Sequence, residues 1–186
     1  GFESYVPGAY IFPPGWTIET TNPTGTWFMY SSSTTYSAST YPRIQESGSD
    51  GNAQDESLIS PSIDCSALSN VYLKTDTFYF YSYSPDYATF TIYGSIDGGT
   101  SWTMIQQYTV TTTGARSIDI TTLAAGQSDV KFKFRFESPA DTTLSSYAYF
   151  DNFWVGNPAL WGPMGDNPPA GWDIQNSPSN PTTWTN

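Results

Sequence analysis

The chain has no histidine, one cysteine, and only six lysines and arginines against seventeen aspartates and glutamates. Without histidine, neither a serine–histidine nor a cysteine–histidine nucleophile system can form. The lone Cys65 allows no internal disulfide and no cysteine-based zinc site, and we expect it to be a small buried residue at a strand end. A formal net charge of −11 argues against nucleic-acid binding, which requires a basic field.

Long hydrophobic runs are also missing. No apolar run approaches the roughly 20 residues that span a bilayer, so no membrane span is predicted in this fragment. Charged residues make up only 12% and aromatic residues 17%, which is unlike the composition of disordered chains. Tyrosine, tryptophan and phenylalanine are therefore expected to fill the core of a single domain.

The clearest structural pattern lies in residues 130–137, where apolar and charged residues alternate. This period of two predicts a half-buried strand of an antiparallel sheet. One face carries Val130, Phe132, Phe134 and Phe136, and the other carries Lys131, Lys133, Arg135 and Glu137. The cationic stripe is interpreted as a solvated sheet face, with an interface to an acidic neighbour as the alternative. Residues 147–155, rich in aromatic residues, are predicted to be the returning strand.

Short strands separated by turns are expected along the rest of the chain. They are predicted at residues 16–20, 27–30, 57–61, 71–83, 87–95, 102–110 and 117–120, with residues 87–95 paired to 71–83. A polar stretch at 31–55 is interpreted as a loop, and residues 123–126 as one helical turn. No segment shows sustained helical periodicity. The sequence therefore predicts an all-β fold, a jelly-roll β-sandwich of two antiparallel sheets.

Residues 95–102, Ser-Ile-Asp-Gly-Gly-Thr-Ser-Trp, resemble the hairpin signature known as the Asp-box. Asp97 can accept hydrogen bonds from the turn's N–H groups, and the glycines permit the tight turn. Trp102 is expected to anchor this turn in the core. Repeated copies of the signature mark sialidase-like propellers, whereas a single copy predicts a structural turn.

The end of the chain repeats features of its beginning. Pro-Ala-Gly-Trp-Asp-Ile at 169–174 is similar to Pro-Pro-Gly-Trp-Thr-Ile at 13–18, and both are followed by Asn-Pro and a tryptophan. We interpret residues 1–156 as one module and residues 157–186 as a linker and the start of a second, truncated copy. The chain begins at Gly1 without a signal-like segment and is interpreted as a mature or excised fragment. Its high serine, threonine, tyrosine and asparagine content favours a secreted or cell-surface protein.

Several short motifs occur in a set order along residues 1–156. They are Phe2-Glu3, Pro14-Gly15-Trp16, Leu58-Ile59-Ser60-Pro61-Ser62-Ile63-Asp64, the Ser-x-Asp-Gly-Gly hairpin, and Tyr149-Phe150-Asp151-Asn152-Phe153. In this order the sequence resembles the MAM-like jelly-roll modules of the cleaved-adhesin and choice-of-anchor J type, found on bacterial surface and secreted proteins. It departs from them at Asn152, where a second aspartate is usual. The resemblance implies that the first and last strands lie side by side, often with a structural calcium ion near that seam.

The same resemblance places Glu3 and Asp151 at the positions beside this Ca²⁺ ion. Calcium takes six to eight oxygen ligands, so two carboxylates cannot complete its shell. Asp50, Asn52 and Asp55 in the polar segment are the candidates for further ligands, on composition alone. In the alternative interpretation Glu3 is solvated and Asp151 accepts backbone N–H bonds.

Tyr79, Tyr81 and Tyr83 share one face of the strand predicted at 71–83. Exposed aromatic rings stack on the apolar faces of sugar rings, so these tyrosines are candidate ligand-binding residues. The alternative is that the rings fill the sandwich and turn their hydroxyl groups to water.

The sequence predicts a non-catalytic extracellular adhesion or binding module of a multidomain or tandem-repeat bacterial surface or secreted protein, stabilised by structural Ca²⁺. Its expected partner is a glycan or a protein ligand on a surface. A second hypothesis is a structural repeat subunit of an extracellular filament or surface array, whose partners are neighbouring copies. A third is the carbohydrate-binding accessory domain of a secreted hydrolase.

Overall fold

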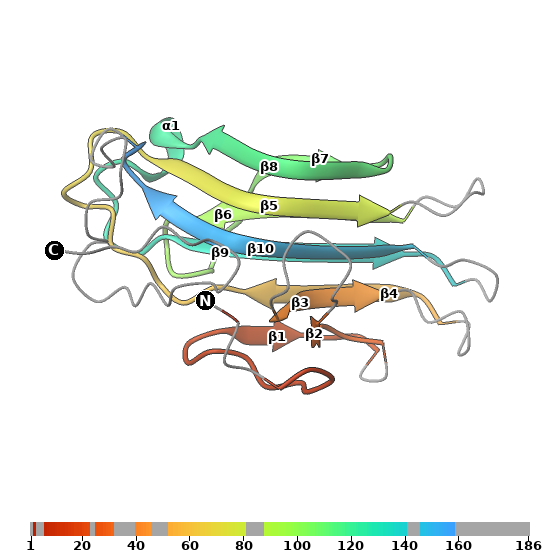
Figure 1. Cartoon of the computed structure of the whole chain (residues 1–186). Coiled ribbons are helices and arrows are strands. Elements are labelled where there is room, and N and C mark those ends of the chain that lie inside the picture. Colours follow the sequence, from red (N-terminus) through yellow and green to blue (C-terminus); the bar gives the residue numbers. More distant parts are fainter. Residues whose placement is uncertain are drawn as a thin grey trace, which may run out of the picture.

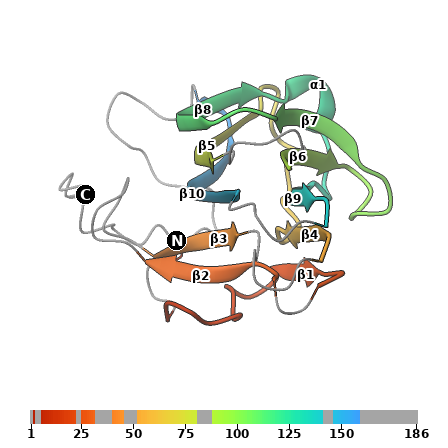
Figure 2. The same cartoon turned by 90° about the vertical axis from the view of Figure 1, so that its right-hand side faces the viewer.

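Two antiparallel five-stranded sheets pack face to face. The computed structural model describes Phe2 and residues 6–22, 25–31, 40–45, 52–80, 88–140 and 146–158. Sheet 1 has the strand order β1–β4–β9–β6–β7, and sheet 2 has the order β2–β3–β10–β5–β8. Figure 2 shows the sheets as two layers. One cluster of buried hydrophobic residues draws on strands of both sheets. The predicted jelly-roll β-sandwich is confirmed.

The strand bounds agree in most places with the expected segments. Sheet 1 consists of β1 (Thr17–Glu19), β4 (Gln54–Ile59), β9 (Lys131–Ser138), β6 (Thr89–Ser95) and β7 (Thr103–Tyr108). Sheet 2 consists of β2 (Phe28–Ser31), β3 (Thr40–Gln45), β10 (Tyr147–Gly156), β5 (Tyr72–Phe80) and β8 (Thr112–Asp119). Helix α1 (Thr121–Ala124) is the single turn expected there. Nowhere in the described parts of the chain is a helix long and apolar enough to cross a membrane.

The core is built from the alternating phenylalanines of β9 and their partners on β10. Phe132, Phe134 and Phe136 are fully buried, as the alternation predicted. Phe134 stacks on Phe150 of β10 with ring centroids 3.8 Å apart. The two strands therefore face each other across the core, and the prediction that residues 147–155 return beside 130–137 is wrong. Alternation shows which residues point inward, but not which sheet a strand joins.

Two other sequence predictions also fail, one on strand pairing and one on the position of a strand. Strand β5 pairs with β10 and β8, whereas β6 pairs with β9 and β7, so these consecutive strands belong to different sheets (Figure 1). Strand β3 lies inside the stretch interpreted as a loop. Its sequence, Thr-Tyr-Pro-Arg-Ile-Gln, contains Pro42 in its interior, and proline normally argues against a strand inside a sheet.

The beginning of the chain packs on the last strand through side chains. The Phe2 ring lies 5.4 Å from Trp16 and 6.0 Å from Phe150, and Trp16 lies 5.4 Å from Phe153. Among the described strands, however, β1 pairs with β4, and the neighbours of β10 are β3 and β5. The implied pairing of first and last strands is not found there. Of the predicted second copy, only residues 157 and 158 are described.

Candidate functional site

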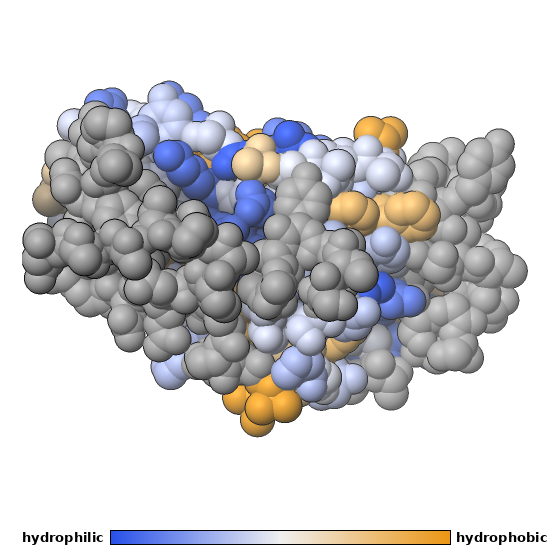
Figure 3. Space-filling view, in the orientation of Figure 1, coloured by the Kyte–Doolittle hydropathy of each residue, from blue (hydrophilic) through white to orange (hydrophobic). Residues whose placement is uncertain are grey.

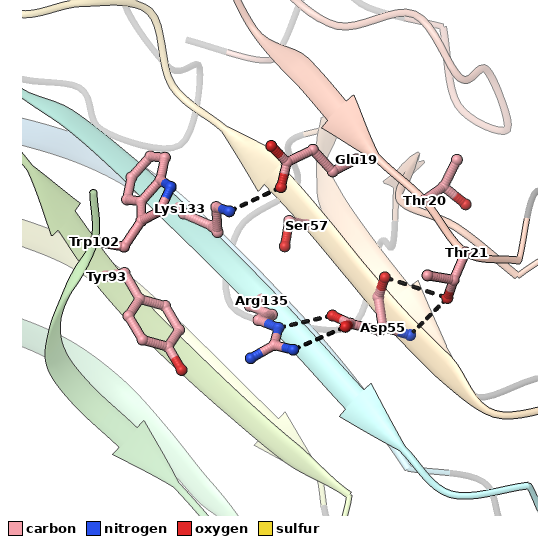
Figure 4. A pocket seen from close by; sticks show the side chains of 9 residues that line it. All are labelled: Glu19, Thr20, Thr21, Asp55, Ser57, Tyr93, Trp102, Lys133 and Arg135. Atoms are coloured by element: carbon pink, nitrogen blue, oxygen red, sulfur yellow. Dashed lines mark hydrogen bonds and ion pairs between the residues drawn. The ribbon is translucent and has the colours of Figure 1, made fainter. Parts of the chain in front are cut away.

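A groove of about 340 Å³ crosses the outer face of sheet 1. Figure 4 shows two aromatic side chains on one side, two cations in the middle, and carboxylates and threonines on the other side. Strands β1, β4, β9 and β6 contribute to it, together with the residue just before β7. Its lining consists of Glu19, Thr20, Thr21, Asp55, Ser57, Tyr93, Trp102, Lys133 and Arg135.

The depth of the groove follows from one small residue on β4, the strand between β1 and β9. Ser57 of β4 lies opposite Glu19 of β1 on one side and opposite Arg135 of β9 on the other. Because residues directly opposite on neighbouring strands share a face, the three side chains form one row across the sheet. The short serine leaves a depression between the two long charged side chains.

Arg135 is fixed by two carboxylates. Its Nε and Nη2 atoms donate to the two oxygens of Asp55 at 2.7 and 2.8 Å, and Nη2 also lies 3.0 Å from Glu137 Oε1. This two-pronged geometry is the strong form of an arginine–carboxylate pair. Hydrogen bonding from Arg135 lowers the pKa of Asp55 below its ordinary value of 3.8. The same bond, with a further contribution from Tyr93, raises the pKa of Arg135. Both groups are therefore charged at neutral pH.

Lys133 is held in a similar way by an acid and an aromatic ring. Its Nζ atom lies 2.8 Å from Glu19 Oε2 and 4.5 Å from the centre of the Trp102 ring. The lysine side chain is only 13% exposed, whereas that of Glu19 is 58% exposed. The cation therefore lies in the groove as a fixed hydrogen-bond donor, and Glu19 keeps much of its surface open to solvent.

The Asp-box turn positions Trp102. Asp97 Oδ1 accepts hydrogen bonds from the Ser101 N–H at 2.9 Å and the Ser95 hydroxyl at 2.7 Å, and Oδ2 accepts from the Ser101 hydroxyl at 2.6 Å. These bonds, those of Ser101 above all, lower the pKa of Asp97. Gly99 has a φ of 98°, and a Cβ there would lie 3.2 Å from the Trp102 ring.

The structural role predicted for this turn is confirmed, but its tryptophan is not in the core. Trp102 is only partly buried and lines the groove, so the prediction of a core anchor is wrong. The other aromatic residue of the groove, Tyr93, was not selected from the sequence. Alternation could have identified it, because Phe90 and Ile92 are fully buried and Tyr93 lies on the opposite face of the same strand.

The outer face of sheet 2 is built differently, from aromatic rings stacked on one another. Phe78 stacks on Tyr149 at 4.6 Å and on Tyr147 at 5.6 Å, and Phe80 stacks on Tyr147 at 5.1 Å. The interplanar angles of these pairs are 3°, 11° and 21°. The rings cover one another's faces. In Figure 3, which views this side, hydrophobic residues show at the right over the end of β5.

Arg43 of β3 closes this layer of rings. Its guanidinium lies 4.4 Å from the centre of the Tyr30 ring and 4.5 Å from that of Tyr147. Its Nη2 atom donates to Gln45 Oε1 at 2.8 Å. The cation therefore occupies ring faces that a ligand would need for stacking.

The predicted tyrosine stripe is not the ligand site at the one member that the structure describes. Tyr79 is fully buried in the core, and its hydroxyl donates to the carbonyl oxygen of Ala88. The prediction that Tyr79 binds a ligand is therefore wrong. The alternative is confirmed for its ring, which fills the sandwich, but not for its hydroxyl, which is buried against Ala88 and does not face water. Tyr81 and Tyr83 lie outside the described residues. Sequence alternation placed Tyr79 on the face opposite Phe78 and Phe80, but it did not show that the face of Tyr79 is the inner one.

The two predicted calcium ligands that the structure places on strands, Asp55 and Asp151, lie on different sheets. Glu3 and Asp50 lie outside the described residues, and Asn52 is an exposed residue before β4. Asp55 lies on sheet 1, where both of its oxygens bind Arg135, and Asp151 lies on sheet 2. In the described part of the chain, no three acidic, histidine or cysteine residues cluster as metal ligands would.

The acid directly opposite Asp151 is Asp76 of β5, which sequence reasoning did not select. Asp151 is 6% exposed, and its Oδ1 atom accepts the backbone N–H of Asn152 at 2.8 Å. Asn152 has a φ of 52° at an irregularity of β10, and its side-chain amide donates to Asp76 Oδ2 at 2.6 Å. The backbone bond expected in the alternative interpretation is therefore present.

Cys65 agrees with the expectation of burial but not with that of a strand end, because it lies in the connection between β4 and β5. Cys65 is fully buried. Burial, followed by the nearby charge of Asp64, raises the pKa of its thiol to about 11. At neutral pH the thiol is therefore protonated and is not in the reactive thiolate form.

No known protein-family model matches the sequence, and no curated protein matches it. Solved structures do match. The sandwich resembles the cleaved adhesin domains of Lys-gingipain. The K2 domain has a TM-score of 0.58 at 18% identity, over 84% of this chain and 94% of that domain. The K3 and K1 domains, from Porphyromonas gingivalis, have TM-scores of 0.54 and 0.52 at 12% and 16% identity. They cover 78% and 80% of this chain and 93% and 94% of their own lengths. At these identities the likeness establishes the fold.

Proposed function

We propose that this chain is a non-catalytic, extracellular binding module of a bacterial surface or secreted protein, and that it binds a glycan in the groove of sheet 1. The observation that carries the proposal is the arrangement of Tyr93 and Trp102 beside two fixed ion pairs. Glycans need apolar surface for their C–H faces and charged or amide groups for their hydroxyls, and recognition pockets generally combine these features. The solved domains that share the fold carry the name adhesin, which agrees with a binding role.

The electrostatics of the groove support a non-catalytic role. Glycoside hydrolysis normally needs one carboxylic acid that stays protonated long enough to donate its proton. Asp55 has the opposite property, because Arg135 lowers its pKa. Glu19 and Glu137 also form ion pairs with the groove cations. These carboxylates are placed to accept hydrogen bonds.

A glycan array tests this proposal. Wild-type protein is expected to bind a restricted set of glycans, and Trp102→Ala is expected to lose about tenfold or more in affinity, as removal of a central tryptophan usually does. Tyr10→Ala is the matched control, because Tyr10 is an aromatic residue that is 55% exposed and lies outside the groove lining. Absence of glycan binding by wild type, or equal losses in both variants, would contradict the proposal.

We further propose that Ca²⁺ binds at Asp151, and that Asp76 belongs to the same site. Two facts support this. Like charges directly opposite each other on paired strands are destabilising, and an ion between Asp76 and Asp151 would remove that repulsion. Carboxylate oxygens are also ligands that calcium prefers, and Asp76 and Asp151 supply them from directly opposite positions. Glu3 and Asp50 remain predicted ligands.

Calorimetry with and without a chelator tests the calcium proposal. Calcium is expected to raise the melting temperature of wild type, because a ligand that binds only the folded state stabilises it. Asp151→Ala and Asp76→Asn are expected to lose this rise, and Asp119→Asn, an exposed acid at the end of β8, is expected to keep it. A wild-type melting temperature that calcium does not change would contradict the calcium proposal.

A structural repeat that contacts neighbouring copies is the second candidate function. It is favoured by three large hydrophobic residues near the start of the chain, Val6, Tyr10 and Ile11, which are 70%, 55% and 69% exposed. Figure 3 shows a hydrophobic patch at its lower edge, where Figure 1 draws this segment. Sedimentation at rising protein concentration is expected to show association of wild type but not of Val6→Ser/Ile11→Ser. A wild type that stays monomeric would count against this function.

A further inference from the structure

We propose that the ligand of the sheet 1 groove is a neutral oligosaccharide that lies across the strands. The groove would recognise it by hydrogen bonds to pairs of neighbouring hydroxyl groups. This inference rests on the glycan-binding function proposed above and adds the charge, the length and the mode of recognition of the ligand. It depends on three properties of the groove, which are the pairing of its cations with carboxylates, its neighbouring hydrogen-bond donors and acceptors, and its length.

The charge of the groove excludes a strongly charged ligand. Lys133 pairs with Glu19, and Arg135 pairs with both Asp55 and Glu137. An anionic sugar would have to displace a carboxylate or lie beside one, within a chain whose net charge is −11. A cationic sugar would meet Lys133 and Arg135, which lie in the middle of the groove (Figure 4). A neutral ligand avoids both costs.

The ion pairs hold hydrogen-bond donors and acceptors side by side. The bonds of Arg135 to Asp55 and Glu137 use its Nε and Nη2 atoms, and in Figure 4 the remaining Nη1 atom lies toward Tyr93. Each oxygen of Asp55 accepts one hydrogen bond from Arg135 and has a second lone pair. Two neighbouring hydroxyl groups of a sugar can therefore accept from the guanidinium or the Lys133 ammonium and donate to a carboxylate.

The pairs are also rigid before a ligand arrives. Lys133 is 13% exposed and Arg135 30% exposed, so little side-chain freedom remains to be lost when a sugar binds. The Trp102 ring supplies the apolar contact beside them. It is held between the Gly99 backbone and the Lys133 ammonium, and it lines the groove.

The length of the groove indicates more than one sugar unit. It runs from β1 across β4 and β9 to β6, which are consecutive strands of sheet 1. Three inter-strand spacings correspond to about 14 Å. A single sugar would contact either the Glu19–Lys133 pair or the Asp55–Arg135 pair, whereas an oligosaccharide across the strands reaches both pairs and Trp102.

Titration calorimetry with matched oligosaccharides tests the inference. The neutral probes are cellohexaose, xylohexaose, mannohexaose and maltohexaose, and the charged probes are an oligogalacturonate and a chitosan oligomer of the same length. At least one neutral hexamer is expected to bind, at least about tenfold more tightly than either charged oligomer and than its own monosaccharide.

Two groove variants and one matched control test whether the oligosaccharide binds in the groove. Asp55→Asn and Lys133→Met are each expected to weaken neutral binding about fivefold or more. Lys74→Met is the control, because Lys74 also lies over a tryptophan, Trp154 at 5.2 Å, but on the outer face of sheet 2. It is expected to bind like wild type. Melting temperatures measured on the same samples confirm that each variant is folded.

Each possible outcome either supports or overturns the inference. A charged oligomer that binds as tightly as the neutral ones overturns it while the glycan-binding function stands. A monosaccharide that binds as tightly as its hexamer overturns the proposed length. Equal losses in Lys74→Met and Lys133→Met overturn the location. If none of the oligosaccharides binds and the glycan array is also negative, the proposed function fails and the inference fails with it.

Discussion

The two outer faces of this sandwich show that aromatic residues alone do not make a binding surface. Sheet 2 carries the larger number of rings, but Phe78, Tyr147 and Tyr149 stack on one another and Arg43 fills the space beside them. Sheet 1 presents only Tyr93 and Trp102 in its groove, yet they stand beside charged groups around a cavity. Rings that cover one another stabilise the fold, whereas isolated rings beside polar groups remain available to a ligand.

The ion pairs of sheet 1 differ from the stacked rings of sheet 2 in their exposure to solvent. The acids paired with Lys133 and Arg135 are 36–58% exposed. Exposed ion pairs contribute about 0–1 kcal/mol each to stability. The ion pairs of sheet 1 are therefore expected to contribute little to stability, and substitutions there should separate binding from folding.

The largest expected effect on stability belongs to the stacked face. Phe78→Ala removes the ring that stacks on both Tyr147 and Tyr149, and it is expected to lower the free energy of unfolding by about 2–3 kcal/mol. Urea denaturation measures this change. Glycan affinity is expected to stay at the wild-type value in the folded protein. A loss of affinity would show that the two faces do not have separate roles.

A smaller effect on stability is expected from Arg135→Gln on the opposite face. The variant loses the bonds to Asp55 and Glu137, but water can solvate both acids, so the free energy of unfolding should fall by less than about 1 kcal/mol. Affinity for the glycan should nevertheless fall severalfold. If Arg135→Gln destabilises the protein as much as Phe78→Ala does, the charged face is a structural element.

Lowering the pH is expected to reduce the stability of the protein through protonation of Asp55. Because Arg135 lowers the pKa of Asp55 in the folded state, the pair contributes stability above the ordinary pKa of 3.8. That contribution is lost as the pH falls from 3.8 through the lower folded-state value. Urea midpoints measured over this window should fall more steeply for wild type than for Asp55→Asn. Parallel pH profiles would show that the pair adds nothing to stability.

The smallest effect is expected for Glu19→Gln. Glu19 is 58% exposed, so its pair with Lys133 should contribute no more than about 0.5 kcal/mol. Urea denaturation in low and in high salt measures it. The difference between variant and wild type should vanish in 1 M salt, where the screening length is about 3 Å. A difference that persists in high salt would indicate a role for Glu19 other than its charge.

The existence of most strands and the buried face of β9 were predictable from the sequence because both follow from the period of two in side-chain direction. Phe132, Phe134 and Phe136 were assigned to the core on this basis, and all three are fully buried. The assignment of strands to sheets was not predictable. In a jelly roll, consecutive strands cross between the layers, and β5 and β6 carry no local signal that places them in different sheets.

The site was predictable only in parts. The cationic stripe of β9 and the Asp-box turn were both identified, but their meeting in one groove depends on the long-range pairing of β9 with β6 and β4. Tyr79 was selected because tyrosines repeat at period two, and the same period holds for an inward face. Asp76 was missed because its proximity to Asp151 follows from the pairing register of β5 and β10.

Nuclear magnetic resonance mapping of the bound glycan tests the central claim most directly. Backbone amide signals of labelled wild-type protein would be followed during titration with the tightest neutral oligosaccharide from the array. The account predicts that the largest shifts occur at Ser57, Tyr93, Trp102, Lys133 and Arg135 on the outer face of sheet 1, with little change at Phe78 and Tyr147. Shifts concentrated on sheet 2 instead would contradict it.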